Sequence, residues 1–213
     1  MSRSRPWARG WPLLYLPLFL VWLFALEARA GGGELVMHHW LDDVIPFREE
    51  FVVAYVAWFP YVLGFVGWLV VRDTDHRDFR RLAWYLITGL TVCLLTYTFW
   101  PNTQLLRPEA YPRDNVFTGL VAALQGFDTP TNVAPSMHVY ASLAVNHVIW
   151  TTRHIRSAWV RWTSLGLLVA ISASTVFLKQ HSVLDVFWAV ALYAALWFVT
   201  AVRLRAGRYS PAR

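Results

Sequence analysis

The chain has 213 residues, of which 57% are hydrophobic, only 15% are charged and 13 are tryptophan. This composition excludes an ordinary soluble domain and predicts an integral membrane protein with a single domain. The net charge of +6 does not indicate nucleic-acid binding, because the basic residues are spread over alternate loops. Cys93 is the only cysteine, so no disulfide can form within the chain.

Six apolar segments predict an all-α, polytopic membrane protein whose six transmembrane helices form a bundle. A spanning helix needs about 20 residues, with about 17–25 tolerated. The first and fourth segments are short by this measure and need flanking residues at the membrane interface. The segments comprise residues 11–26, 51–71, 82–100, 137–152, 160–178 and 183–203.

The first apolar segment has two interpretations. Its basic start, its apolar run and the small residues Ala28 and Ala30 before Gly31 resemble a signal peptide with a cleavage site. The run is long for a signal peptide and contains the bulky Trp11 and Trp22. We therefore favour an uncleaved first helix, and cleavage would leave five helices with the same orientation.

Residues 34–50 predict a short helix that lies at the outer membrane interface. Val36, Trp40 and Val44 recur every four residues, while Asp42 and Asp43 fall on other faces. Pro46 is expected to end this helix.

The loop charges predict the orientation of the chain. Of the 19 basic residues, 14 lie in the two tails and in the loops after the second and fourth segments. The positive-inside rule places those regions in the cytoplasm, including basic tails at 1–10 and 204–213 that flank a core of about 35–203. The loops at 27–50, 101–136 and 179–182 then lie outside, and the plasma membrane is the expected location.

Two short polar motifs lie on this outer side, at 135–138 (Pro-Ser-Met-His) and 179–185 (Lys-Gln-His-Ser-Val-Leu-Asp). Ionisable residues near lipid are costly and indicate function. His181 and Asp185 are four residues apart and share one helix face. The carboxylate can fix the imidazole tautomer and make its other nitrogen nucleophilic. His138 can supply a proton, so the set is typical of phosphoryl transfer.

Three further residues are candidates for binding phosphate. Ser136 is either a simple N-cap or part of an anion site at the start of a helix, and both roles are compatible. Arg107 either grips phosphate oxygens with its guanidinium or is an ordinary loop arginine. Lys179 supplies a cation beside His181.

The two motifs resemble the second and third motifs of the type 2 phosphatidic acid phosphatase superfamily. The form of residues 174–185, with Ser174-Thr175 and Lys179-Gln180-His181, is closer to the branch that contains inositol phosphorylceramide synthases and their bacterial relatives. Residues 41–47 and 58–61 also resemble that branch. The resemblance covers about residues 35–200.

The resemblance implies a six-helix bundle with a site at the membrane face that needs no metal or cofactor. It implies that His181 is the nucleophile, Asp185 orients it, His138 protonates the leaving oxygen and Arg107 holds phosphate. The chain departs from the family at Trp100, where the first motif has lysine, and at Thr175, where the third motif has arginine. Lys179 is the obvious substitute for these cations.

We therefore expect a membrane-embedded lipid phosphate phosphatase that acts through a phosphohistidine. The close alternative is a phosphotransferase that passes a phospho-headgroup to a lipid or polyol alcohol. Alternatives of another class are a metal-dependent membrane hydrolase, with zinc bound by His138, His181 and Asp185, and a non-catalytic lipid-binding protein. The expected partners are a lipid phosphate and the bilayer, with no nucleic acid, and the sequence does not indicate an oligomeric state.

Overall fold

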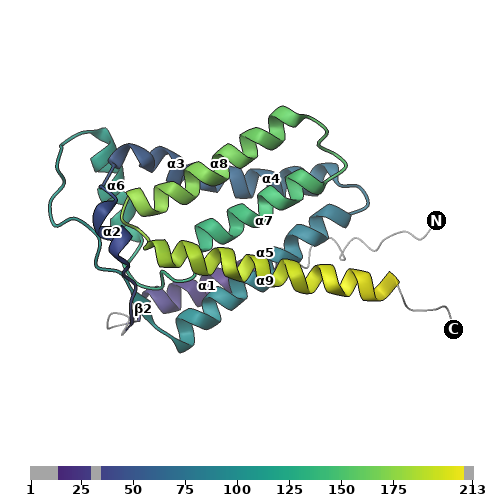
Figure 1. The fold of residues 1–213 in the computed structure, drawn as a ribbon, viewed down its shortest axis with the longest axis horizontal. Coiled ribbons are helices and arrows are strands. Elements are labelled where there is room, and N and C mark those ends of the chain that lie inside the picture. The colour runs from purple at the N-terminus through teal and green to yellow at the C-terminus, as the bar shows by residue number, and fades with distance from the viewer. Residues whose placement is uncertain (1–13, 30–34, 209–213) are drawn as a thin grey trace.

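The computed structural model describes residues 14–29 and 35–208, with side chains as far as Val202 (Figure 1). The described chain is mostly helical, with a 3-10 turn, η3 (Glu49–Phe51), and two short strands, β1 (Leu35–Val36) and β2 (Asn102–Thr103). The α-helices are α1 (Tyr15–Glu27), α2 (Trp40–Val44), α3 (Val52–Val56), α4 (Trp58–Arg72), α5 (Arg77–Phe99), α6 (Val116–Phe127), α7 (Met137–Thr151), α8 (Ala158–Phe177) and α9 (Val183–Arg208).

Over the residues that the structure describes, the six predicted apolar segments coincide with helical structure, but they are not equivalent. Within the described residues, four helical stretches are long and apolar enough to cross a membrane: Glu49–Arg72, Arg77–Phe99, Ala158–Phe177 and Val183–Val202. α1 has 13 residues and α7 has 15, which is below the roughly 17 residues that a spanning helix needs. The helical class is therefore confirmed, and four candidate spans are present.

Helix α7 lies at the centre of the bundle, in contact with α4, α5, α8 and α9 (Figure 1). Its buried residues include Val139, Ala141, Ala144, Val145 and Val148. Small side chains such as alanine let neighbouring helices approach closely. Other helices therefore pack around most of α7 and bury much of its surface.

The second predicted span is divided into η3, α3 and α4. Pro60 has no N–H to donate to the carbonyl of Val56, and the helix is interrupted nearby, at Ala57. The break directs Trp58, at the start of α4, toward α7, where its indole Nε1 donates to the carbonyl of His138 at 3.1 Å.

The connecting loops divide into two sets at opposite ends of the bundle. Contacts between Lys179 and Asp42 and between Arg107 and Gln180 join loops at one end, which we call the histidine end because His138 and His181 lie there. At the opposite end, Thr152 after α7 bonds to Asp78 at the start of α5. The sequence divides the loops in the same way, because the loops at this opposite end are the ones rich in basic residues.

Three features differ from the sequence prediction. Residues 101–136, expected as a loop, contain α6, because Asn115 caps an apolar twelve-residue stretch through the N–H groups of Phe117 and Thr118. The sequence predicted an all-α protein, whereas the structure also has two short strands, β1 and β2, which pair in parallel. α9 continues to Arg208, so the predicted tail at 204–213 is partly helical, while the tail at 1–10 lies outside the described residues.

Gly89 should be the glycine least tolerant of substitution in the bundle. A Cβ at Gly89 would overlap the ring of Tyr140, whose hydroxyl donates to the carbonyl of Tyr85 at 2.6 Å. We expect Gly89→Ala to lower the free energy of unfolding by about 1–3 kcal/mol, as overpacking does in dense cores. Thermal unfolding in detergent measures the effect.

Gly67→Ala is the matched control, because a Cβ at Gly67 has no heavy atom within 4 Å. Equal melting temperatures for the two variants would contradict the close packing of α5 on α7.

Candidate functional site

The imidazole of His181 is held by the buried carboxylate of Asp185. His181 Nδ1 lies 3.2 Å from Asp185 Oδ2, and the same oxygen accepts the backbone N–H of Ser182 at 2.9 Å. With Nδ1 donating to the carboxylate, Nε2 carries the lone pair. Nε2 has no hydrogen-bond partner among the described residues, and His181 keeps 7% of its surface exposed. This arrangement leaves one ring nitrogen available as a nucleophile.

His138 faces His181 from the first turn of α7. The two ring centroids are 5.9 Å apart and the rings are steeply inclined, at 61°. His138 packs between Tyr55, at a centroid distance of 4.4 Å, and Trp58, at 4.6 Å. The structure therefore brings together the two histidines that the sequence separates by more than forty residues.

Ser136 joins the two motifs through its backbone. Its N–H donates to the carbonyl of Asp185 at 3.1 Å, which ties the start of α7 to the first turn of α9. Ser136 occupies the N-cap position of α7, as predicted, but its side chain makes no capping bond. Its hydroxyl is buried and has no protein partner in the described chain. The first free N–H groups of α7 lie beside it, and together they can bind an anion.

Arg107 lies over the residue that precedes His181. One of its terminal nitrogens donates to the side-chain oxygen of Gln180 at 2.8 Å and to the carbonyl of Asp128 at 2.7 Å. Burial lowers the pKa of Arg107, and the attraction of Asp128 opposes that shift. A guanidinium remains charged under such a shift, so Arg107 brings a positive charge to the histidine end.

Lys179 is occupied by backbone oxygens. Its ammonium donates to the carbonyls of Asp42 and Ile45, both at 2.5 Å, and burial lowers its pKa. An ammonium has three N–H donors, so one remains for another acceptor. Through these contacts Lys179 holds the end of α2 against residues 179–185. That Lys179 binds phosphate stays a prediction.

Asp42 is a residue that the sequence analysis placed on the polar face of an interfacial helix. The structure buries it, with 2% of its surface exposed, and its carboxylate accepts the Ser182 hydroxyl at 2.5 Å and the Val183 N–H at 2.9 Å. Asp42 thus caps the start of α9, far along the chain from its own helix. Asp42 also accepts the backbone N–H of His39 at 2.8 Å from the third position of α2, whereas the neighbouring Asp43 is exposed.

Asn102 holds the loop that leads into residues 135–138, the motif that contains His138. Its side-chain oxygen accepts the N–H groups of Val133 and Ala134, both at 2.8 Å. Its side-chain nitrogen donates to the carbonyls of Trp100 and Ala134, both at 3.0 Å. The amide is buried and fully satisfied, so it fixes the backbone that leads into Ser136 and His138.

Asp128 was not a candidate in the sequence, because it follows α6 in a region expected as a loop. Its carboxylate accepts the Tyr55 hydroxyl at 3.2 Å, and Tyr55 is the residue whose ring packs on His138. Burial raises the pKa of Asp128, and attraction to His181 and Arg107 opposes the rise. Asp128 is therefore linked to His138 through the side chain of Tyr55.

Two apolar cavities flank the start of α7. One, of about 740 Å³, lies between α5 and α9 and extends to Pro135 and Asn102. The other, of about 190 Å³, lies among α1, α4, α5 and α7 and extends to Trp58 and Met137. Both have the apolar walls that hydrocarbon chains require.

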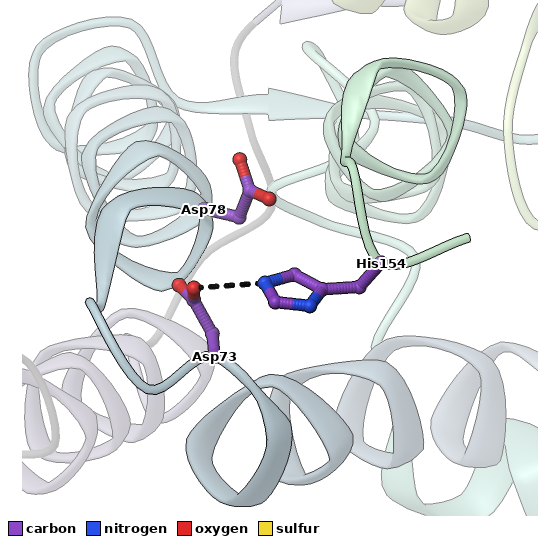
Figure 2. A group of neighbouring side chains, drawn as sticks. All are labelled: Asp73, Asp78 and His154. Atoms are coloured by element: carbon purple, nitrogen blue, oxygen red, sulfur yellow. Dashed lines mark hydrogen bonds and ion pairs between the residues drawn. The ribbon is translucent and has the colours of Figure 1, made fainter. Parts of the chain in front are cut away.

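A separate group at the opposite end has the composition of a metal site. Figure 2 shows Asp73, Asp78 and His154, whose ligand-type atoms lie within 4.8 Å of one another. Asp73 pairs with His154 at 3.2 Å and accepts the Phe79 N–H at 2.7 Å. Asp78 accepts the Thr152 hydroxyl at 2.5 Å. Protein donors thus already satisfy these carboxylates, and the group joins two loops.

No protein-family model, curated protein or solved structure matches this chain.

Asn102 should be essential to the stability of the histidine end. Asn102→Ala leaves several buried backbone groups without partners, and each such group costs about 1–3 kcal/mol. We expect a loss of about 3 kcal/mol or more in the free energy of unfolding, measured by thermal unfolding in detergent. Glu109→Gln, at an exposed position in the same connection, is the control and should melt like the unmodified protein. An unchanged melting temperature for Asn102→Ala would contradict this role.

Proposed function

We propose that this protein is a membrane-embedded phosphoesterase that cleaves a lipid phosphate through a phosphohistidine on His181. The observation that carries the proposal is the His181–Asp185 pair, which faces His138 at the start of a central helix. The resemblance of both motifs to the type 2 phosphatidic acid phosphatase superfamily agrees with this chemistry.

The proposed reaction has two steps. The cycle starts with His138 protonated and His181 neutral. His181 Nε2 attacks phosphorus, the bond from phosphorus to the leaving oxygen breaks, and the His138 imidazolium gives that oxygen a proton and becomes neutral. Water then attacks the phosphohistidine, the phosphorus–nitrogen bond breaks, and His138 takes a proton from the water. Asp185 keeps the imidazole oriented and stabilises its positive charge in the transition state.

Phosphate binding is assigned to three groups. Arg107 supplies positive charge, and the unpartnered Ser136 hydroxyl and the N–H groups at the start of α7 supply donors. The remaining N–H of Lys179 is the third candidate. The apolar cavities beside Pro135 and Met137 suit the hydrocarbon part of a lipid substrate.

Transfer to an alcohol is a second candidate, and the pair of cavities favours it. One cavity borders Met137 and the other borders Pro135, so two lipid chains can lie beside the start of the helix that carries His138. An alcohol would then replace water in the second step. Product analysis with and without an added lipid alcohol separates hydrolysis from transfer.

The membrane location of the site follows from the loop charges. We propose that the histidine end is extracytoplasmic and that both termini are cytoplasmic, in the plasma membrane. The support is the concentration of 14 of the 19 basic residues in the tails and in the loops of the opposite end.

The roles of the two histidines predict different variant behaviour. His181→Ala removes the attacking nitrogen, so it should abolish turnover of every substrate. His138→Ala removes only the proton donor, and an aryl phosphate has a leaving group that needs that proton less. We expect His138→Ala to lose about 10²–10⁴-fold on a lipid phosphate and to retain measurable activity on the aryl ester.

Asp185→Asn should have an activity between those of His181→Ala and His138→Ala, because the His181 imidazole remains but loses its carboxylate partner. Phosphate trapped on His138 instead of His181 would refute the assigned roles. Activity that is lost with a chelator and restored by zinc would favour the metal-dependent alternative.

The orientation predicts which introduced cysteines react in intact cells. Asp114 and Arg156 are both exposed, the first at the histidine end and the second at the opposite end. In a Cys93→Ala background, Asp114→Cys should react with a membrane-impermeant thiol reagent and Arg156→Cys should react only after the cells are opened. The reverse pattern would place the site in the cytoplasm.

A further inference from the structure

Helix α6 has an apolar face that no described part of the chain covers. Val116, Leu120 and Phe127 keep 78%, 48% and 91% of their surface exposed, and Ala123 is exposed as well. These residues recur at intervals of four, three and four positions, so they share one side of the helix. An exposed patch of large apolar side chains is typical of a surface that contacts a membrane or another protein.

The opposite face of α6 packs on the protein. Thr118 and Val121 are buried there, and the helix contacts η3 and α3. Asn115 caps the start of α6 by accepting the N–H groups of Phe117 and Thr118. Its side-chain nitrogen also donates to Glu49 at 3.0 Å. These contacts fix the rotation of α6 about its own axis and direct the apolar face outward.

A surface suited to lipid adjoins this face. Figure 1 shows α6 beside α3 at the histidine end, and η3 and α3 begin the candidate membrane span Glu49–Arg72. On that span the apolar side chains of Val53, Val56 and Phe59 are exposed, as they are on a helix that contacts lipid. Because α6 packs on the start of this span, its own apolar face lies next to a region that lipid covers.

Charge and length place α6 within one leaflet. Residues 115–127 contain no charged side chain, whereas Arg113, just before the helix, pairs with Glu49 at 2.7 Å and with Glu50 at 2.9 Å. The 12 residues of α6 extend over about 18 Å, and the hydrocarbon core of a bilayer is about 30 Å thick. The helix is therefore too short to cross the bilayer, and its apolar face suits the boundary between headgroups and acyl chains.

We propose that the face of α6 formed by Val116, Leu120, Ala123 and Phe127 is a membrane-contacting surface, covered by phospholipid acyl chains of the leaflet at the histidine end. A second copy of the chain is the competing occupant. The inference concerns contact with the bilayer, so it is independent of the reaction proposed for the histidines.

Arg107 connects the C-terminal end of α6 to the loop that carries His181. Its guanidinium donates to the carbonyls of Gln125 at 3.4 Å and Asp128 at 2.7 Å, and to the side chain of Gln180 at 2.8 Å. Gln180 directly precedes His181. Contact of α6 with lipid therefore holds this loop close to the headgroups.

Fluorescence quenching tests the proposal with full-length protein in vesicles of phosphatidylcholine and phosphatidylglycerol. Leu120→Cys and Phe127→Cys, each in a Cys93→Ala background, carry a thiol-linked fluorophore. A face that lies about 5–10 Å inside the boundary region brings both labels within reach of a nitroxide on the upper acyl chain and out of reach of aqueous iodide. We expect nitroxide-bearing lipids to quench both labels strongly and iodide to leave most of their fluorescence.

Asp114→Cys is the matched control, because Asp114 is an exposed, charged residue shortly before the helix. Its label should show the reverse pattern, with strong quenching by iodide and weak quenching by the nitroxide lipids. All three labelled proteins should melt like the unlabelled Cys93→Ala protein in detergent, because none of the three substituted side chains is buried.

Two results would overturn the inference. If iodide and not the nitroxide lipids quenches the labels at 120 and 127, the face lies in water. If neither reagent reaches them, protein covers the face, and linkage of two Leu120→Cys chains by a bifunctional thiol reagent would identify a second copy. The measurement requires no turnover, so either result leaves the proposed function standing, and the absence of a phosphohistidine would leave this inference standing.

Discussion

The histidine end depends on Asp185, which connects two helices and one imidazole. Its side chain accepts His181 Nδ1 and the Ser182 N–H, and its backbone carbonyl accepts the Ser136 N–H. Because Asp185 is buried, these bonds act in a low-dielectric environment where an unpaired carboxylate would be costly. The orientation of His181 and the placement of the first motif are therefore set by one residue.

Three further polar side chains keep the surrounding loops in place by binding backbone groups. Asp42 caps α9, Asn102 satisfies the loop before Ser136, and Lys179 binds the carbonyls that end α2. Polar groups that are buried without partners destabilise a fold, so each of these networks excludes alternative loop arrangements. These bonds hold the backbone on which His138 and His181 stand, which a site built from loops requires.

The opposite end has short turns, and its buried carboxylates connect loops to one another. Asp73 and Asp78 are buried there, and they join the turn after α4 to the turn after α7 through His154 and Thr152 (Figure 2). These bonds hold α7 at its far end, as Ser136 and Asp185 hold it at the histidine end. A 15-residue central helix is thus fixed at both ends by polar contacts and along its length by apolar packing.

The sequence by itself determined the helical segments, because hydropathy is a local property. It also paired His181 with Asp185, but by assuming that both lie on one helix, whereas His181 lies in the loop before α9 and reaches Asp185 from there. It also indicated Ser136 as an N-cap and His138 as a neighbour of the same site. It did not reveal the burial of Asp42 or the place of Asp128, because these depend on Ser182 and Tyr55, which lie more than fifty residues away in the chain. It also missed α6, although the Asn115 cap of that helix is local. Only the tertiary structure decided that Lys179 faces backbone carbonyls and that Asp128 contacts Tyr55, whose ring packs on His138. The reason is that a side chain's partners are set by packing and not by its own segment.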